Sequence, residues 1–225
     1  MRDRGIGSAR AALVARWFGV TDNQVRGRTG DGAAPTPAID IAGGRLILLT
    51  GASGSGKSTL LRRLRRGSNR SARWVDLNDI RLGQAAVIDA MAEAMGGEGD
   101  DETTIVAALE ALSRVGLGEV WSYLRTPAEL SEGQRSRLRL ALALARAKPP
   151  PDKPLRVLSA DEFAAPLDRV TALVVSRALR KAVTAKPDLC AVVATAREDL
   201  EVALDPDLVV HCDFGAFTVC ERGGQ

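Results

Sequence analysis

Eight residues of the chain have the types and the spacing of a phosphate-binding loop. They read GASGSGKS, from Gly51 to Ser58, and satisfy the pattern G-x-x-x-x-G-K-[ST]. The glycines let backbone N–H groups turn inward around a triphosphate, Lys57 supplies charge for the β and γ phosphates, and the Ser58 hydroxyl can ligate Mg²⁺. The predicted nucleotide-binding residues are Gly51, Ala52, Ser53, Gly54, Ser55, Gly56, Lys57, Ser58 and Thr59.

An acidic pair follows another apolar run. Residues 157–160 are mostly apolar and lead into Asp161 and Glu162. At the end of a buried strand, Asp161 is expected to coordinate Mg²⁺, directly or through water, and Glu162 to act as the general base that activates water. The pair is a weak signal alone and a strong one beside a phosphate loop.

Alternating strands and helices must position these residues. Residues 45–50 predict a strand before the loop, and residues 57–66 an amphipathic helix after it. Further strands are expected at WVDL, LRVLSA and LCAVVAT, a helix at DRVTALVVSRALRKAVTA, and a terminal hairpin at LVVHCDF and AFTVCE. This order predicts an α/β fold with a mainly parallel sheet flanked by helices, and phosphate chemistry at its carboxyl edge.

The chain divides into two predicted parts. A loop at residues 26–37 separates an N-terminal element, residues 1–38, from a main domain, residues 39–225. Helical patterns at 84–95 and 104–114 predict a short helical insert over about 79–147. Its last helix begins at LSEGQ, residues 130–134, where Ser131 and Gln134 fit a capping box.

Composition sets limits on the class of protein. A length of 225 residues gives room for one ordinary α/β domain or at most two small ones. The apolar share of 45% and the charged share of 26% are typical of soluble globular proteins, and there is no run of eighteen apolar residues. The basic N-terminus is a poor signal peptide, so we expect a cytoplasmic protein without membrane insertion. The cysteines at 190, 212 and 220 lack metal-ligand spacing and are expected to be reduced structural residues.

A local excess of positive charge is open to two interpretations. Six arginines lie between residues 61 and 74, at positions 62, 63, 65, 66, 70 and 73, although the net charge of the chain is only +3. The cluster from Arg62 to Arg73 is either a solvated helix face or a surface for an anionic partner such as nucleic acid.

The order of GASGSGKS, LSEGQ and DEFAAPLD resembles the ATP-binding cassette (ABC) ATPases over residues 15–222. Their signature is LSGGQ at a helix start, and a loop like DEPTSALD follows their acidic strand. Here the signature serine lies 74 residues after Lys57. WFGV, WVDLN, LSEGQR and DEFAAPLDRVTA look most like small soluble cassettes that are sometimes fused to an acetyltransferase-like domain.

The resemblance implies a P-loop NTPase fold whose helical insert carries the ABC signature, and an ATPase that sandwiches Mg-ATP between two copies of the chain. Ser131, Gly133 and Gln134 would meet the nucleotide of the other subunit, with Asp168 in the interface loop. Closure and opening would act on an unknown protein partner. The alternatives are the ATPase subunit of an ABC transporter with a separate membrane chain, an SMC-like nucleic-acid maintenance ATPase, and a nucleotide sensor that does not hydrolyse.

Two family positions are filled differently here. The histidine that contacts the γ phosphate is missing, because the single histidine, His211, lies in a later strand as a core or edge residue. Ala196 or Arg197 takes its place, and Arg197 is hypothesised to contact the phosphate. The glutamine that contacts metal and water is represented by Asn78 or by Gln84, and Gln84 is counted among the metal ligands with Ser58 and Asp161.

Two further assignments depend on orientation. Glu132 replaces the first glycine of the signature and is expected to point away from a bound phosphate, since a carboxylate there would oppose binding. Trp17 or Phe18 would stack on adenine, or else both belong to a buried core.

Overall fold

The computed structural model describes residues 8–19, 35–68, 72–97, 101–145 and 155–222. The chain forms two compact units, residues 1–35 and 36–225. In the first unit, α1 (Ala9–Trp17) is capped by Ser8 and has no buried residue. Trp17 and Phe18 are 70% and 78% exposed, so the prediction that they belong to a buried core is wrong. Most of the predicted loop at 26–37 lies outside the described residues.

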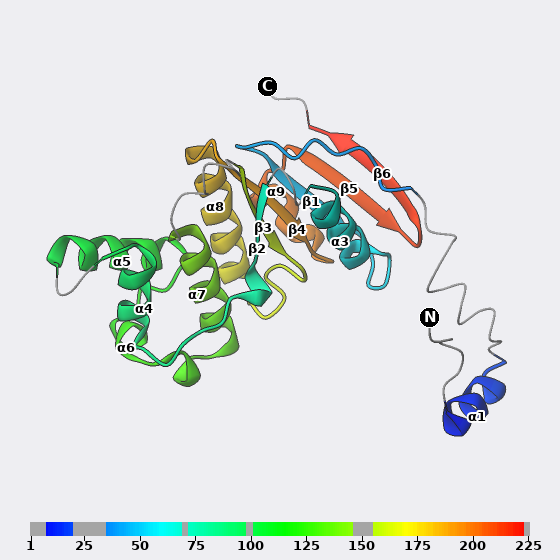
Figure 1. Ribbon diagram of the computed structural model, residues 1–225, viewed down its shortest axis with the longest axis horizontal. Coiled ribbons are helices and arrows are strands. Elements are labelled where there is room, and N and C mark those ends of the chain that lie inside the picture. The colour runs from blue at the N-terminus through cyan, green and yellow to red at the C-terminus, as the bar shows by residue number, and fades with distance from the viewer. Residues whose placement is uncertain (1–7, 20–34, 69–71, 98–100, 146–154, 223–225) are drawn as a thin grey trace. The chain divides into compact units, whose positions relative to one another are not determined.

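The second unit is built on one six-stranded sheet with the order β2-β3-β4-β1-β5-β6 (Figure 1). The strands are β1 (Leu46–Thr50), β2 (Ala72–Asp76), β3 (Leu155–Ala160), β4 (Leu189–Ala194), β5 (Leu208–Asp213) and β6 (Ala216–Glu221). Strands β1 to β5 run parallel, and only β6 is antiparallel, paired with β5. The prediction of a mainly parallel sheet with a terminal hairpin is confirmed.

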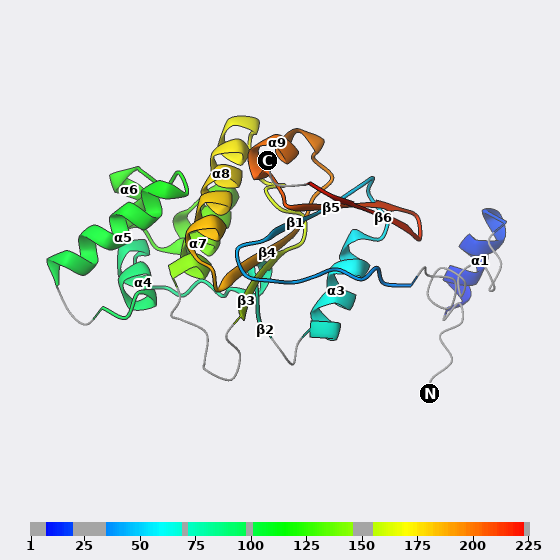
Figure 2. The ribbon, with the colours of Figure 1, turned by 90° about the horizontal axis from the view of Figure 1, so that it is seen from above.

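Strands β1 and β4 are buried along their whole length because helices cover both faces of the sheet. In β1, Leu46 and Leu48 pack into the larger core, which includes residues of α7 and α8. Ile47 and Leu49 point to the other face, where the second core contains leucines of α3. Figure 2 shows α7 and α8 on one side of the sheet and α3 on the other.

The helices between the strands form the layers on the two faces of the sheet and the helical insert. The layer helices are α3 (Lys57–Ser68), α8 (Arg169–Ala185) and α9 (Glu201–Leu204), with a 3₁₀ turn η3 (Glu198–Leu200) before α9. The insert contains α4 (Val87–Ala94), α5 (Glu102–Arg114), α6 (Val120–Leu124) and α7 (Glu132–Ala145), with 3₁₀ turns η1 (Leu77–Asp79) and η2 (Pro127–Glu129). In Figure 1, α4, α5 and α6 lie together beside the sheet. Within the described ranges, no helix has the length and apolar character needed to cross a bilayer.

Several single residues can be compared with their predictions. Cys190 and Cys212 are buried free thiols and Cys220 is an exposed one, so no disulfide joins the three cysteines. Burial raises the pKa of the Cys190 thiol to about 12, which keeps it protonated and unreactive. His211 lies on β5 next to the edge strand and is exposed rather than buried in the core.

Candidate functional site

The phosphate loop connects the end of β1 to the start of α3. Gly51, Gly54 and Gly56 have φ angles of 138°, 78° and 106°, which residues with a side chain rarely adopt. A Cβ atom at Gly51 would lie 2.2 Å from the carbonyl oxygen of Cys212 in β5. Only glycine therefore fits at the point where the loop leaves the sheet.

The side chains of this loop suit a polyphosphate. Lys57 Nζ reaches back across the loop and donates hydrogen bonds to the carbonyl oxygens of Gly51 and Ala52, each at 2.7 Å. The Ser55 hydroxyl is buried, and among the described residues it has no hydrogen-bond partner. A cation and an unsatisfied hydroxyl thus belong to one short loop at the positive end of α3, and this combination suits a phosphate group.

The acidic pair lies at the same edge of the sheet. Asp161 and Glu162 directly follow β3, and β4 separates β3 from β1. Because all three strands are parallel, their carboxyl ends place this pair and the phosphate loop at one edge. The Ser58 hydroxyl and the Asp161 carboxylate are the oxygen ligands that Mg²⁺ prefers, and nucleotide oxygens and water would complete its shell. The described residues contain no cluster of three or more metal-ligating side chains.

The turn that carries Glu162 has an unusual backbone. Glu162 and Ala164 have positive φ angles of 54° and 59° although neither is glycine. A residue in this region costs of order 1–3 kcal/mol, and it persists only where the surroundings hold it. The Phe163 N–H donates to the Ala194 carbonyl at 2.8 Å, and the Thr195 hydroxyl donates to the Phe163 carbonyl at 3.2 Å. The end of β4 therefore fixes this turn.

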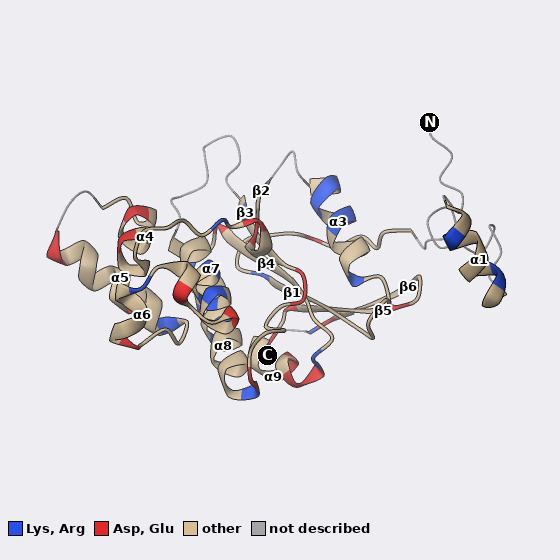
Figure 3. Ribbon diagram, turned by 90° about the horizontal axis from the view of Figure 1, so that it is seen from below, with Lys and Arg blue, Asp and Glu red and all other residues tan. Residues whose placement is uncertain are grey.

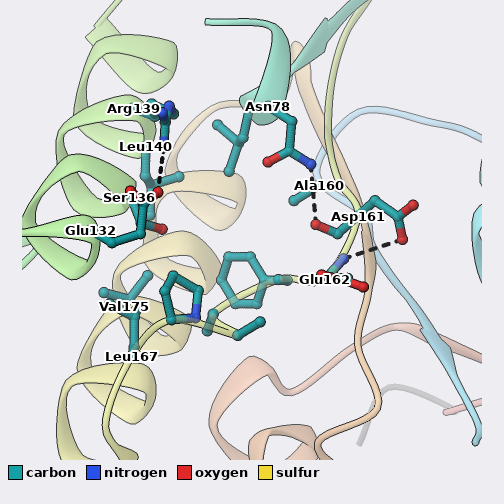
Figure 4. Close-up of a pocket in the computed structure, with 15 residues that line it drawn as sticks. Asn78, Glu132, Ser136, Arg139, Leu140, Ala160, Asp161, Glu162, Leu167 and Val175 are labelled. Carbon is teal, nitrogen blue, oxygen red and sulfur yellow. Dashed lines mark hydrogen bonds and ion pairs between the residues drawn. The ribbon is translucent and has the colours of Figure 1, made fainter. Parts of the chain in front are cut away.

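Asn78 lies beside the acidic pair, whereas Gln84 does not. The Asn78 side chain donates to the backbone carbonyl of Asp161 at 3.2 Å (Figure 4). The Asp76 carboxylate caps the η1 turn by accepting the Asn78 N–H at 2.9 Å, and burial raises the pKa of Asp76. Gln84 is exposed and does not line the cleft that contains Asn78, Asp161 and Glu162. This placement favours Asn78 over Gln84 as the amide next to the metal site.

The LSEGQ segment forms the capping box that its sequence predicts. The Ser131 hydroxyl accepts the Gln134 N–H at 3.2 Å, and the Gln134 side-chain oxygen accepts the Ser131 N–H at 2.9 Å. The Gln134 amide nitrogen also donates to the Ser122 hydroxyl of α6 at 3.1 Å. Gln134 thus uses both ends of its amide to fix the start of α7, and its predicted contact with nucleotide stays a prediction.

The Glu132 carboxylate is paired with two arginines of its own helix. Arg135 donates to its carboxylate at 2.9 and 3.0 Å, and Arg139 donates at 3.3 Å. Hydrogen bonds from Arg135 and Arg139 lower the pKa of Glu132, so the side chain is charged at neutral pH. It forms part of the wall of a cleft of about 650 Å³ that also contains Asp161 and Glu162 (Figure 4). The side chain is therefore turned along α7, toward the two arginines.

The loop after Glu162 contacts the signature. Asp168 caps α8 by accepting the Thr171 N–H at 3.0 Å, and hydrogen bonds from Thr171 lower the pKa of Asp168. Before it, Leu167 packs so closely on Gly133 that a Cβ atom there would lie 3.2 Å from Leu167 Cδ2. A side chain at position 133 would therefore require Leu167 to shift by a few tenths of an ångström.

Arg197 makes contacts that its sequence position does not reveal. One guanidinium nitrogen donates to the carbonyl oxygens of Ala164 and Leu167 at 3.3 and 2.9 Å. The other two nitrogens form a fork with the Asp199 carboxylate at 3.2 and 3.0 Å. Ala196, the other residue proposed for the histidine position, is exposed. The predicted contact of Arg197 with phosphate is untested, but the side chain points to the loop that follows Glu162.

Comparison with known proteins identifies the family. The family model described as "ABC transporter" matches residues 37–150, which is just over half of the chain. The chain belongs to the ABC transporter family. A search of curated proteins gave no match.

Solved structures of ABC cassettes share the fold. A dimeric post-hydrolysis state of the cassette MJ0796, bound to ADP and Pi, is 22% identical, covers 83% of this chain and 89% of that one, and has a TM-score of 0.60. CbiO1 from Clostridium perfringens, described as part of the transporter complex cbiONQ, is 21% identical over 83% and 80% of the two chains, with a TM-score of 0.57. An inward-facing putative metal-chelate type ABC transporter is 22% identical over 81% and 74%, with a TM-score of 0.57. At this identity the likeness shows the fold alone.

In this ABC cassette the arginine cluster is partly engaged within the chain. Four of its members lie on α3 (Figure 3), at positions 62, 63, 65 and 66, and Arg73 lies on β2. Arg62 donates to the Ser58 carbonyl at 3.1 Å, and Arg65 lies 3.7 and 3.4 Å from the carboxylates of Asp76 and Asp79. Arg70 lies outside the described residues. Neither these contacts nor the comparisons support the predicted nucleic-acid partner.

Proposed function

We propose that this ABC cassette binds Mg-ATP and hydrolyses it in a nucleotide-sandwich dimer, whose closure and opening act on a partner protein. The observation that carries the proposal is that β1 and β3 both end at the carboxyl edge of the sheet. It places the phosphate loop and the Asp161–Glu162 pair at the same end of the sheet. Family membership supports ATP as the nucleotide.

The residues divide the reaction among them. Lys57 and the inward N–H groups of the loop would hold the triphosphate, and Ser58 with Asp161 would hold Mg²⁺, which offsets charge on the phosphates. Glu162 would accept a proton from the attacking water, with Asn78 nearby to position it. The bond between the γ phosphorus and the bridging oxygen breaks, and ADP and phosphate leave.

The proposed dimer rests on the separation of two anion sites. The positive end of α7, where Ser131 and Gln134 form the capping box, would be a second anion site. The cleft next to it is lined by Glu132, Asp161 and Glu162 but by none of residues 51–59. A second copy of the chain would bring its signature to the phosphate loop of the first, and MJ0796 is described as dimeric.

Two kinds of partner protein are candidates. The leading one is a protein moved by a soluble ATPase. The second is a separate membrane chain, with this cassette as the ATPase subunit of a transporter, in line with the family and with cbiO1. An exposed apolar face on α6 favours a docked partner in either case: Val120, Trp121 and Leu124 are 63%, 73% and 63% exposed. Ser122 of the same helix accepts the bond from Gln134, which links this face to the signature.

The direct test is the oligomeric state of the full chain with Glu162→Gln. Size-exclusion chromatography with light scattering should show a monomer without nucleotide and a dimer with Mg-ATP. Lys57→Ala in the same background is the matched control and should remain a monomer. A monomer under all conditions would contradict the sandwich. A separate experiment addresses the partner: cross-linking from position 121 would distinguish a membrane chain from a soluble partner.

A further inference from the structure

We propose that Arg197 is a positioning residue that holds the Glu162 turn and the following loop in the arrangement needed for hydrolysis, and that it does not contact the phosphate. The proposal rests on the proposed ATPase function and assigns to Arg197 a role other than that of the missing histidine.

The hydrogen bonds of Arg197 define this role. Its guanidinium group donates to two backbone carbonyls of the loop, those of Ala164 and Leu167. Both bonds come from the same nitrogen, Nη1, whose two N–H groups donate to the two carbonyls. Asp199 occupies the remaining two nitrogens at 3.2 and 3.0 Å and thereby fixes the plane of the group. With 25% of its side chain exposed, Arg197 is largely enclosed by these partners.

The bonds lie where the backbone most needs support. Ala164 is one of the two non-glycine residues of this turn with positive φ, and its carbonyl accepts from Arg197; the other, Glu162, lies two residues before it. The Arg197 N–H also donates to the Thr195 hydroxyl, which in turn donates to the Phe163 carbonyl. Side chain and backbone of Arg197 therefore hold the same turn from two directions.

The same contact extends to the signature. Leu167, whose carbonyl accepts from Arg197, packs against Gly133 in the first turn of α7. One side chain thus connects the end of β4, the turn with the general base and the helix that would meet the second nucleotide. These bonds engage four of the five N–H donors of the guanidinium within the chain.

Steady-state kinetics and nucleotide binding separate the two roles. For Arg197→Ala we expect kcat to fall at least tenfold while the dissociation constants for ATP and ADP change less than twofold. Arg197→Lys should recover little of kcat, because one ammonium group cannot form the fork. Asp199→Ala should reproduce part of the loss. Arg169→Ala is the matched control: Arg169 is 79% exposed and lies 3.9 Å from Asp199, and its loss should leave kcat unchanged.

Two further measurements decide the outcome. In a Glu162→Gln background, Arg197→Ala should lower the residual rate less than twofold, since a positioning residue acts through the group that it positions. Hydrogen exchange at the amides of Phe163, Ala165 and Leu167 should be at least tenfold faster in Arg197→Ala and unchanged in Arg169→Ala, whether or not ATP is hydrolysed.

Failure of the inference differs from failure of the proposed function. A tenfold loss of affinity for ATP but not for ADP in Arg197→Ala would make Arg197 a phosphate ligand and overturn the inference. Unchanged exchange in the 161–168 turn would also overturn it. A wild-type chain that neither binds nor hydrolyses ATP would refute the proposed function, and the exchange result would still decide whether Arg197 holds the turn.

Discussion

The Asp207 carboxylate joins α8 to the start of the strand that ends in the phosphate loop. It accepts the Leu46 N–H at 2.7 Å and two donors of Arg180 at 2.6 and 3.2 Å. The side chains of Arg180 and Asp207 are 24% and 31% exposed, so the pair is mostly enclosed. Replacing Asp207 by asparagine keeps the shape and removes the charge and one acceptor oxygen.

The expected loss of stability follows from these contacts. A hydrogen bond to a charged group contributes about 1.5–3 kcal/mol. The Leu46 N–H and Arg180 Nη1 both donate to Oδ2, so an asparagine oxygen there can accept both bonds but without the negative charge. The bond from Arg180 Nη2 to Oδ1 is lost, because an amide nitrogen is a donor. Water and Asp205, 3.9 Å from Arg180, compensate part of the loss. For Asp207→Asn we therefore expect the free energy of unfolding to fall by about 2 kcal/mol. In a chain of this length that corresponds to about 4–8 °C in Tm.

Urea unfolding followed by circular dichroism measures this loss, with Asp205→Asn as control. Asp205 is 70% exposed, and its loss should change stability by less than about 0.5 kcal/mol. Burial acts to raise the pKa of Asp207, but hydrogen bonds from Arg180 and Leu46 and the charges of Arg180 and Arg45 outweigh it, so the folded pKa is lowered.

A lowered pKa determines the direction of the pH dependence. The contribution of Asp207 is complete above the unfolded pKa of about 3.9 and is lost as the pH falls through the lower, folded pKa. The difference between wild type and Asp207→Asn should thus shrink only below about pH 4. A loss under about 0.5 kcal/mol at pH 7, or a difference that persists in strong acid, would refute the reasoning.

Three more predictions concern the site. Gly51→Ala should destabilise the fold by about 2–4 kcal/mol and abolish ATP binding, because its Cβ would lie 2.2 Å from the Cys212 carbonyl oxygen. The control is Gly67→Ala, whose Cβ would have no atom within 4 Å. Calorimetry should show that this control keeps the stability and the ATP affinity of the wild type. Glu132→Gln should change the ATP concentration for dimerisation less than threefold; a tenfold gain in affinity would show that the carboxylate opposes the phosphate. Asn78→Ala should lower kcat at least tenfold and Gln84→Ala less than twofold, and the reverse order would disprove the assignment of the amide.

The features that sequence predicted well are those that short segments determine. Gly51 to Ser58 carry their own φ requirements, and the capping box of Ser131 and Gln134 is complete within four residues. The strand before the loop is recognisable because a strand buried on both faces is a nearly continuous apolar run. For such elements the local pattern and the tertiary fold favour the same structure.

The residues that sequence could not assign depend on pairing between distant segments. Asn78 meets Asp161 only because β2 pairs with β3, and their separation in the chain gives no hint of this contact. Arg197 bonds to carbonyls some thirty residues earlier, which the order of strands brings to the end of β4. Backbone acceptors carry no sequence signal, so a pattern of residue types could suggest a phosphate as partner but not a carbonyl.

The two departures from the family pattern share one physical solution. Glu132 adds a negative charge at the signature, and Arg135 and Arg139 neutralise it. Arg197 adds a positive charge where the family has histidine, and Asp199 neutralises it. Both added charges are paired within the chain, so the attraction for a triphosphate would rest on Lys57 and the positive end of α3. Raising the salt concentration should therefore weaken ATP binding to Arg197→Ala and to wild type by the same factor, whereas a phosphate ligand at Arg197 would make the wild type more sensitive.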